Sequence, residues 1–319
     1  MSLLINKTGI LTTIQDLGRT NFARFGINPN GAMDQTAARL INVLLANDEN
    51  EAVLEMHYPA PEIIFEKSAI FAIGGADLGA TLDGKPLENW RIYYAESGNV
   101  LKFTARNFGN RVYLSIKNGF KIQKVLNSAS TNLTANFGGF EGRTLRKGDR
   151  IFFTDESQTA PKRTNFKISN SLIPFYSRFP TVRVTMGAEF EDLKPASKRL
   201  FQEQTFRITR KSNRMGYRLD GEPLLLKTPR ELVSSAVNFG TIQLLPDGNI
   251  IVLMADHQTT GGYPRLANII KTDIPLAAQL GANDKIGFHL ISLEDAESLL
   301  IQFENEFKLL KIGAKFQNG

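Results

Sequence analysis

The chain has 319 residues, of which 42% are hydrophobic and 22% are charged, and its formal net charge is +6. This composition predicts a soluble globular protein with two ordinary domains, without a bilayer-spanning stretch or a signal peptide, so we expect a cytoplasmic location. There is no cysteine and there are three histidines, which excludes disulfides and argues against a metal site. The basic residues are scattered without a nucleic-acid-binding motif, so nucleic acid binding is weakly indicated and an anionic small molecule suits the charge at least as well.

The chain begins with a predicted strand and a predicted helix, each bounded by charged residues. Residues 11–15 alternate as a strand does, and Asp16, Gly18 and Arg19 follow. Asp16 and Arg19 either close a turn as an ion pair or face a ligand. Asp34 stands before an apolar stripe of helical spacing, so we expect it to cap a helix. The stripe consists of Ala37, Leu40, Ile41, Leu44 and Leu45.

Residues 52–56 and 62–108 are predicted to form consecutive strands joined by tight turns. Glu55 lies between apolar neighbours in the first of them, so its carboxylate needs a partner or a cavity. Residues 79–85 have the spacing of a phosphate-binding loop, but a proline occupies the position of the magnesium-binding hydroxyl. Asp83-Gly84 is more typical of a hairpin turn, so we expect no Walker-type ATP site here.

A long polar region divides the chain into two halves. Residues 128–149 are predicted to form a loop, either functional or a solvated connection, and residues 155–171 a linker. A turn followed by a strand ending in phenylalanine occurs three times, at residues 98–103, 148–153 and 283–288. This faint repeat suggests two related β domains. We therefore predict a first domain at residues 1–165 and a second at residues 166–319.

The second half is predicted to contain strands and short helices. Residues 206–219 form two strand-like pieces around a polar elbow, where Asn213 and Arg214 either bind a carboxylate or shape the turn. We expect a short helix at residues 266–270. Near the C-terminus, Ser292 opens a segment like a capping box, and an amphipathic helix that packs on the β structure is expected to follow.

The stretch most typical of a functional site lies at residues 249–264. Residues 250–255 are an apolar run of strand length, as in a strand buried on both faces. Five polar residues follow from 256 to 260, and Gly261-Gly262 then leaves the backbone accessible. Each buried polar group left without a partner costs roughly 1–3 kcal/mol, which favours the rim of a pocket. The alternative is an ordinary strand that ends in a Thr-Gly-Gly turn.

Five segments taken together resemble one known family. They are Thr12-Thr13-Ile14-Gln15-Asp16-Leu17-Gly18-Arg19, Gly31-Ala32-Met33-Asp34 and residues 137–143, 212–219 and 256–264. The set is similar to the allophanate hydrolase subunit 2 family, which includes the C subunit of bacterial 5-oxoprolinase, a Kip-type antagonist of a kinase inhibitor, and carboxyltransferase subdomains A and B of urea carboxylase. The resemblance extends over residues 9–288. The chain departs from the family pattern at Gly187-Ala188-Glu189 and at Leu245.

The resemblance implies a mainly β fold of two cyclophilin-like β-barrel domains, with a few short helices and a C-terminal helix. It implies an ATP-dependent amide (lactam) hydrolase subunit, active with a second cyclophilin-like subunit of the Kip-inhibitor type and a barrel-type subunit. Such a complex opens 5-oxo-L-proline to L-glutamate, with ATP as co-substrate. The alternatives are biotin-dependent carboxyl transfer to a small amide such as urea, with biotin on another chain, and a non-catalytic antagonist of a Kip-type kinase inhibitor.

Opening a resonance-stabilised lactam has two requirements. A carboxylate must orient the attacking water, and hydrogen-bond donors must stabilise the developing oxyanion. The predicted catalytic residues are Asp256, Thr259 and Thr260. The predicted substrate-binding residues are Asp16, Arg19, Asn213, Arg214, Gln258, Gly261, Gly262 and Tyr263. Asp16 and Arg19 are expected to form the opposite wall of the pocket, with Arg19 or Arg214 binding the substrate carboxylate. His257 is a less favoured general acid, because strand alternation turns it away from Asp256. No metal ligands are predicted.

Overall fold

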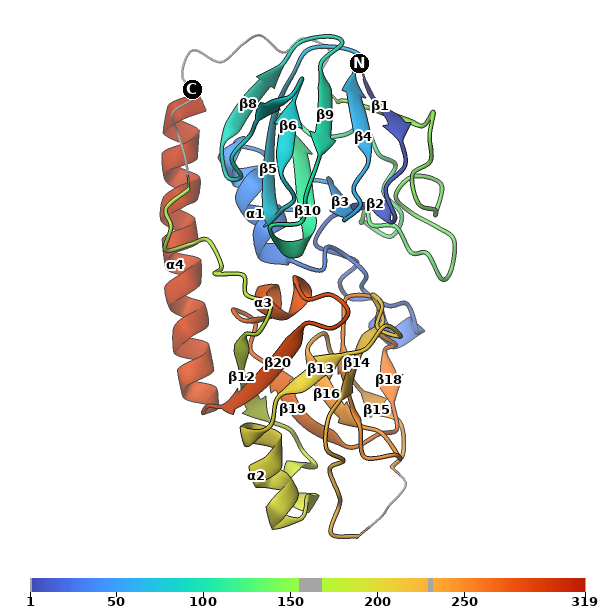
Figure 1. Cartoon of the computed structure of the whole chain (residues 1–319), viewed down its shortest axis with the longest axis vertical. Helices are drawn as coiled ribbons and strands as arrows, with labels where there is room; N and C mark the ends of the chain where they lie inside the picture. The colour runs from blue at the N-terminus through green and yellow to red at the C-terminus, as the bar shows by residue number, and fades with distance from the viewer. Residues whose placement is uncertain (1, 155–167, 229–231, 319) are drawn as a thin grey trace. The chain divides into compact units, whose positions relative to one another are not determined.

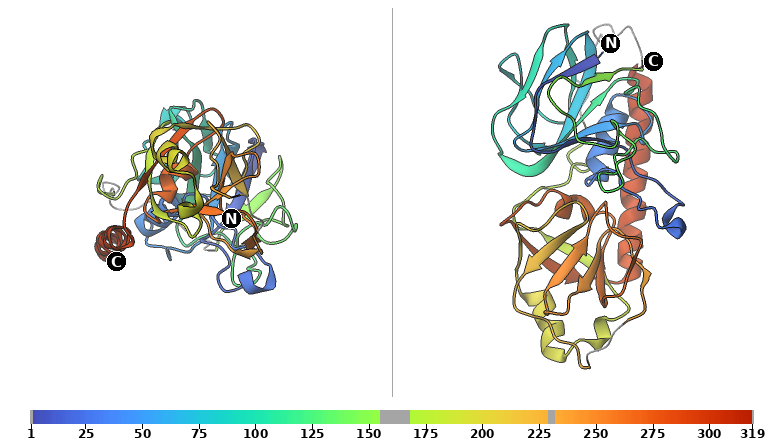
Figure 2. Two further views of the ribbon diagram at one scale, coloured as in Figure 1. Left: turned by 90° about the horizontal axis from the view of Figure 1, so that it is seen from below. Right: turned by 90° about the vertical axis from the view of Figure 1, so that its right-hand side faces the viewer.

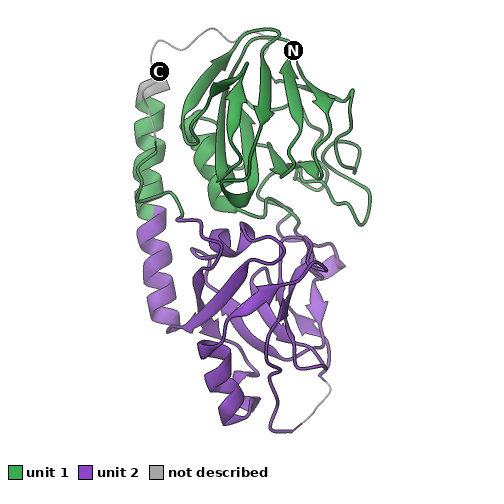
Figure 3. Ribbon diagram, in the orientation of Figure 1, with its two compact units in different colours: residues 1–19, 30–174, 305–319 green, residues 20–29, 175–304 purple. Residues whose placement is uncertain are grey.

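The computed structural model describes residues 2–154, 168–228 and 232–318 (Figure 1). The predicted boundary between residues 165 and 166, and most of the predicted linker, lie outside the described residues. The chain divides into two compact units, which Figure 3 colours separately. The first unit consists of Met1–Arg19, Asn30–Pro174 and Asn305–Gly319, and the second of Thr20–Pro29 and Phe175–Glu304. Each unit is therefore assembled from segments that are distant in the sequence.

The first unit contains two antiparallel sheets whose facing sides enclose its core. The strand order is β11-β1-β4-β9-β6-β7 in one sheet and β2-β3-β10-β5-β8 in the other. Leu3 and Phe65 from the first sheet and Phe71 and Leu114 from the second are buried in one hydrophobic cluster. The rings of Phe65 and Phe71 lie 5.0 Å apart, so the two sheets meet through their apolar faces.

The strands of this unit are β1 (Ser2–Lys7), β2 (Thr12–Gln15), β3 (Val53–His57), β4 (Glu62–Phe65), β5 (Ala69–Asp77), β6 (Ala80–Leu82), β7 (Lys85–Pro86), β8 (Ile92–Ala95), β9 (Val100–Phe103), β10 (Phe108–Ile116) and β11 (Arg150–Phe152). The sequence predicts a cyclophilin-like β-barrel domain in this half, and the structure has its strands in two sheets. Within the described residues, no hydrogen-bonded ladder joins the edge strands of one sheet to those of the other. The fold here is a pair of packed sheets.

The second unit is built on a closed seven-stranded barrel, as predicted. Its strand order is β12-β19-β16-β17-β14-β13-β20, and the parallel pairing of β12 with β20, for example Val182 with Phe288, closes the ring. The aromatic rings of Phe201 and Phe288 stack with their centroids 5.1 Å apart, and both side chains are buried. The mainly β class inferred from the sequence is thus confirmed.

The elements of the second unit are η1 (Ala23–Phe25), β12 (Thr181–Met186), η2 (Phe190–Asp192), α2 (Pro195–Glu203), β13 (Phe206–Ile208), β14 (Gly216–Asp220), β15 (Ser235–Ala236), β16 (Thr241–Leu244), β17 (Ile250–Leu253), β18 (Thr260–Gly261), β19 (Arg265–Ile269), α3 (Ile274–Ala278) and β20 (Lys285–Leu290). The short strands β15 and β18 pair with each other outside the barrel. Strand β18 begins at Thr260, the last residue of the polar stretch that the sequence marks as functional.

Two helices begin where local sequence signals place them. Helix α1 (Gln35–Leu44) starts after Asp34, whose carboxylate accepts a hydrogen bond from the Ala37 amide at 2.9 Å. Helix α4 (Leu293–Asn318) starts after Ser292, whose hydroxyl accepts from the Asp295 amide at 3.0 Å. Figure 2 shows α4 as one uninterrupted helix. Across the described residues, no helix combines the length and apolar character needed to cross a membrane.

The prediction of a helix at residues 266–270 is wrong, because this segment belongs to strand β19 (Arg265–Ile269). It pairs with β12 on one side and with β16 on the other, so both of its edges are hydrogen-bonded in the barrel. A short apolar run fits a buried strand and a buried helix equally well when only periodicity is considered.

The hairpin expected at Asp83-Gly84 is confirmed. Strands β6 and β7 pair across it, and both turn residues have positive φ, 48° and 80°. This is the backbone conformation of a tight two-residue hairpin, which Asp-Gly adopts readily. The phosphate-loop spacing at residues 79–85 is therefore coincidental.

The buried carboxylate of Glu55 links the start of α1 to the second sheet. Its Oε2 accepts hydrogen bonds from the Met33 amide and the Tyr113 hydroxyl, both at 2.8 Å. The Tyr113 oxygen in turn accepts from the Asp34 amide at 2.9 Å. Burial, followed by the charges of Glu55 and Asp34, raises the pKa of Tyr113 well above its usual value. The phenol therefore stays protonated and donates to the carboxylate.

Replacing Tyr113 with phenylalanine is expected to lower the free energy of unfolding by about 1.5–3 kcal/mol, because a buried carboxylate loses a donor. Urea denaturation monitored by circular dichroism measures this loss. Tyr93→Phe is the matched control, since the Tyr93 hydroxyl bonds to the exposed backbone of Glu88; about 1 kcal/mol or less is expected there. Equal losses in the two variants would contradict the role given to Tyr113.

Candidate functional site

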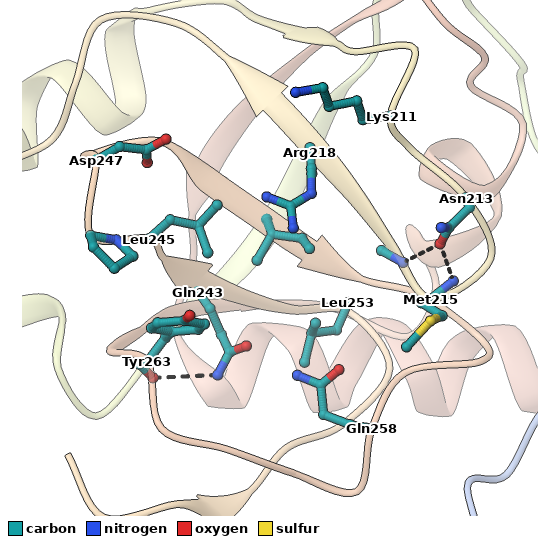
Figure 4. Close-up of a pocket in the computed structure, with 13 residues that line it drawn as sticks. Lys211, Asn213, Met215, Arg218, Gln243, Leu245, Asp247, Leu253, Gln258 and Tyr263 are labelled. Carbon is teal, nitrogen blue, oxygen red and sulfur yellow. Dashed lines mark hydrogen bonds between the residues drawn. The ribbon is translucent and has the colours of Figure 1, made fainter. Parts of the chain in front are cut away.

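A pocket of about 450 Å³ lies on the outer side of the barrel in the second unit (Figure 4). Strands β14, β16 and β17 form its floor, because Arg218 and Gln243 both pair in register with Ile251 and project to the same face. The segment after β17 forms its rim. The polar residues that line it are Lys211, Asn213, Arg218, Gln243, Asp247 and Gln258.

Gln243 is fully buried at the edge of this pocket. Its Nε2 donates to the Tyr263 carbonyl at 3.3 Å, while its Oε1 has no hydrogen-bond partner among the described residues. A Cβ on Gly261 would stand 2.7 Å from this Nε2, so a larger residue here would require the amide to shift. Because Oε1 is itself buried, a ligand N–H could satisfy it only after the side chain or the rim shifts.

Asp256 and Arg214, predicted for separate roles, are paired with each other. The Arg214 guanidinium donates to both carboxylate oxygens, Nε to Oδ2 at 2.8 Å and Nη2 to Oδ1 at 3.0 Å, and both side chains are buried. The Asp256 amide also donates to the Arg214 carbonyl at 2.8 Å. Asn28 belongs to the N-terminal segment of the same unit, Thr20–Pro29, and its side chain donates to the Asp256 carbonyl at 3.0 Å. The pair therefore fixes the path of the rim segment.

The other predicted residues of the rim divide between the pocket and its support. Gln258 and Tyr263 line the pocket. Thr260 and Gly261 form β18 and pair with β15, and the Thr259 carbonyl accepts from the Val237 amide at 3.2 Å. Neither threonine, and neither Gly261 nor Gly262, is among the lining residues. These four residues shape the rim from behind.

Asn213 lines the pocket and also shapes the turn before β14. Its Oδ1 accepts hydrogen bonds from the backbone amides of Met215 at 2.8 Å and Gly216 at 3.4 Å (Figure 4). These bonds occupy its acceptor in the manner of an Asx turn. Of the two alternatives left open by the sequence, the structure shows the turn-shaping contact.

Asp16 and Arg19 belong to the first unit, where both are buried. The Asp16 carboxylate accepts from Ser128 Oγ at 2.7 Å, from Ser130 Oγ at 2.6 Å and from the Ala129 amide at 2.6 Å. The Arg19 guanidinium donates to the Ser130 carbonyl and lies 4.6 Å from the centre of the Phe137 ring. Both residues therefore anchor the long loop predicted at residues 128–149 onto β2. They do not form the turn-closing ion pair that was one of the two alternatives from the sequence.

His257 is buried beside the site. Its Nδ1 lies 2.6 Å from the Gln258 carbonyl oxygen. Burial lowers the pKa of His257 below its ordinary value of 6.5, against smaller opposing effects from this hydrogen bond and from Asp256. His257 is absent from the pocket lining, which places the ring behind the rim.

Sequence reasoning missed Gln243, Arg218 and Lys211. One signal for Gln243 was present, because this polar side chain lies among the apolar residues Ile242, Leu244 and Leu245, where it needs a hydrogen-bond partner if it is buried. The same three letters, Thr-Ile-Gln, occur at residues 13–15 and 241–243. Leu245, where the chain departs from the family pattern, also lines the pocket, whereas Glu189 forms an ion pair with Arg265 at 2.8 Å.

The sequence profile of the family "carboxyltransferase domain, subdomain A and B" matches residues 25–290, and the chain belongs to this family. Within it, the chain is 38% identical over 288 residues to the C subunit of 5-oxoprolinase from Haemophilus influenzae, covering 90% of each protein. It is 36% identical over 295 residues to the C subunit of 5-oxoprolinase from Escherichia coli, covering 92% of this chain and 93% of the relative.

Among solved structures, the K. lactis urea amidolyase superposes with a TM-score of 0.90 at 25% sequence identity. The superposition covers 97% of this chain but 20% of that much longer one. The fold of this chain therefore recurs as one part of a larger enzyme. The family resemblance inferred from the five sequence segments is confirmed.

Asp256→Asn is expected to lower the free energy of unfolding by about 3–5 kcal/mol, because it leaves the Arg214 guanidinium buried without its counter-charge. The control is Asp220→Asn, which breaks the Arg207–Asp220 pair, whose side chains are 57% and 49% exposed; about 1 kcal/mol or less is expected. Urea unfolding followed by circular dichroism gives both values. A double variant, Arg214→Met with Asp256→Leu, should recover much of the loss, and equal effects of the two single variants would argue against this assignment.

The stability of the protein is expected to decrease as the pH falls from about 6.5 towards the lowered pKa of His257. In that range the unfolded chain binds a proton at this residue and the native chain does not, so protonation favours unfolding. The unfolding free energy measured against pH should fall less steeply in His257→Gln. His289→Gln, at an exposed position, is the control and should keep the wild-type slope. Identical slopes in all three proteins would exclude the effect.

Proposed function

We propose that this chain is the C subunit of an ATP-dependent 5-oxoprolinase and that its pocket binds 5-oxo-L-proline. The complex opens this lactam to L-glutamate. The ligand has three recognisable groups, namely a lactam N–H, a carbonyl oxygen and a carboxylate. The observation that carries the proposal is the buried Oε1 of Gln243, which has no partner among the described residues.

The Gln243 amide suits a planar ligand that donates a hydrogen bond. With its Nε2 held by the Tyr263 carbonyl, its Oε1 remains as the acceptor, so the amide orientation is fixed. A lactam N–H directed at this oxygen gains a hydrogen bond and removes the cost of a buried unmet acceptor. A ligand without an N–H donor would leave the Gln243 Oε1 acceptor unpaired, so the same free-energy cost disfavours its binding.

The cationic side of the pocket suits the ligand's carboxylate. Arg218 and Lys211 both line the pocket and contribute positive charge to it (Figure 4). Asp247 stands beside them, and its hydrogen bonds with Asn249, together with the charge of Arg218, lower its pKa. Arginine binds carboxylates through two parallel hydrogen bonds, so we assign the substrate carboxylate to Arg218 in place of Arg214.

This geometry supports a binding and orienting role for the chain within the complex. Because Arg214 occupies the Asp256 carboxylate, we assign Asp256 to holding Gln258 and Tyr263 in position. Neither Thr259 nor Thr260 lines the pocket, so we assign both to the rim. Activation of the lactam carbonyl by ATP, and attack by water, then require groups from the Kip-inhibitor-type subunit and the barrel-type subunit.

A second candidate is carboxyl transfer from biotin to a small amide, with biotin carried on a partner chain. The likeness to urea amidolyase favours it, and a urea N–H would satisfy Gln243 Oε1 equally well. Urea has no carboxylate, however, and would leave the positive charges of Arg218 and Lys211 unused. The charge of the pocket therefore favours 5-oxoproline.

The test uses the chain reconstituted with its two partner subunits and ATP, with glutamate release as the measurement. Gln243→Met keeps the side-chain length and removes the acceptor, so kcat/KM for 5-oxoproline is expected to fall roughly 10- to 100-fold. Gln202→Met, at an exposed position on α2 of the same unit, should keep wild-type kinetics. Co-purification shows whether the complex still assembles.

Wild-type activity in Gln243→Met would remove this residue from substrate binding. 2-Pyrrolidinone, which lacks the carboxylate, is expected to be the poorer substrate. Absence of glutamate release in the intact wild-type complex, together with carboxylation of urea in the presence of a biotin-carrying partner, would establish the second candidate instead.

A further inference from the structure

Strand β11 is the outermost strand of the six-stranded sheet in the first unit. Strand β1 pairs with it on one side. On the other side, the Lys121 amide donates to the Phe152 carbonyl at 2.8 Å, at the end of the strand. The Ile122 amide then donates to the Phe120 carbonyl at 3.0 Å, so the chain turns back and leaves the edge. The rest of β11 has no second pairing strand among the described residues.

The backbone of Arg150 faces outward at this edge. The Ile5 amide donates to the Asp149 carbonyl at 2.9 Å, so Asp149 is bonded to β1. In an antiparallel ladder, residues bonded to one neighbour alternate with residues whose N–H and C=O point the other way. Arg150 and Phe152 therefore both point away from β1, and the bond from Lys121 to Phe152 agrees with this. In the part of the chain that the structure describes, the outward N–H and C=O of Arg150 have no hydrogen-bond partner.

A groove of about 640 Å³ lies along this edge. It is lined by β11 and by the glycine-rich loop at residues 136–142, one of the segments on which the family resemblance depends. A side chain at Gly138 would collide with Arg19, and a side chain at Gly139 with Thr131. At these two positions the loop therefore presents backbone to the groove, which leaves room for another chain beside β11.

The charged residues of the groove leave one positive charge uncompensated. Arg150 pairs with Glu66 at 2.9 Å, and Glu141 pairs with Arg143 at 3.0 Å. Lys121 lines the same groove and forms no ion pair with any described residue. The groove therefore suits a partner that brings a negative charge.

We propose that an extended segment of a partner subunit occupies this groove and pairs with β11 as an added strand. Extended polypeptide carries donors and acceptors at strand spacing, so it satisfies both backbone groups of Arg150. An apolar side chain of the segment packs on Phe152, which is 51% exposed, and an acidic one meets Lys121. The identity of the partner rests on the proposed function, which supplies the Kip-inhibitor-type and barrel-type subunits.

The first test is hydrogen–deuterium exchange at single-residue resolution, on the free chain and on the chain reconstituted with both partner subunits. The Arg150 amide should exchange rapidly in the free chain and roughly 10-fold or more slowly in the complex, because it gains an acceptor. The Ile151 amide, which points towards β1, is the internal control and should be slow in both. Unchanged exchange at Arg150, slow exchange already in the free chain, or failure of the complex to form overturns the proposal.

The second test compares two variants of Arg150 by isothermal titration calorimetry with the partner subunits. Arg150→Pro removes the outward N–H and keeps the bonds between β11 and β1, since an edge strand tolerates proline at such a position. Its Kd should rise roughly 10-fold. Arg150→Ala removes the exposed pair with Glu66 but keeps the N–H, so its Kd should stay within about threefold of wild type. Equal effects of the two variants overturn the backbone pairing, and circular dichroism confirms that both are folded.

The charge of the segment is tested by the same titration. Lys121→Glu should raise the Kd roughly 10-fold, and more at low salt than at high salt. Lys85→Glu is the matched control, because it makes the same change in net charge at an exposed position on β7, the opposite edge of the sheet. Equal effects of the two reversals would overturn the acidic character assigned to the segment.

These outcomes are distinguishable from those of the proposed function. Glutamate release by a complex in which the Arg150 amide stays unprotected would refute the added strand alone. Protection of this amide in a complex that releases no glutamate would refute the assigned activity alone.

Discussion

The buried ion pair between Arg214 and Asp256 is the constraint on which the candidate site depends. It joins the turn before β14 to the segment after β17, two parts of the chain that are 42 residues apart. Removing two charges from water is costly, and the cost is repaid only when both charges and their hydrogen bonds are in place. The rim of the pocket is therefore held in a single conformation, with Gln258 and Tyr263 directed towards the lining.

Gln243 is a second buried polar group at this pocket, and the proposed selectivity rests on it. Gln243 is fully buried. Its Nε2 donates to the Tyr263 carbonyl, and its Oε1 has no hydrogen-bond partner among the described residues. A protein retains such an arrangement at a cost in stability, which a suitable ligand removes on binding. A side chain at Gly261 would crowd the Gln243 amide, which connects this glycine to the site although it does not line the pocket.

The elements that were predictable from the sequence are those with local signals. Asp34 and Ser292 mark helix starts through hydrogen bonds within one turn, and Asp83-Gly84 specifies its hairpin by backbone conformation. Strand β19 was not predictable in this way, because its identity comes from neighbours on both sides. Closure of the barrel likewise depends on β12 meeting β20, which are far apart in the sequence.

The same division applies to the candidate site. The polar stretch from residue 256 to 263 was found from its sequence, and two of its members do line the pocket. The mutual pairing of Asp256 with Arg214 was missed, because a carboxylate near a pocket suggests catalysis until its partner is seen. Arg218 was missed as a pocket residue because its exposure on β14 depends on which face of the barrel strand it occupies.

The position of the pocket on the outer side of the barrel has an evolutionary consequence. Inward-facing side chains of β14, β16 and β17 fill the core, while the lining comes from the alternate positions on the same strands. Exchanges at Arg218, Gln243 or Leu245 can thus alter the preferred ligand while the interior packing stays intact. One scaffold is then able to diversify across lactams, ureas and related amides by changing a few outward residues.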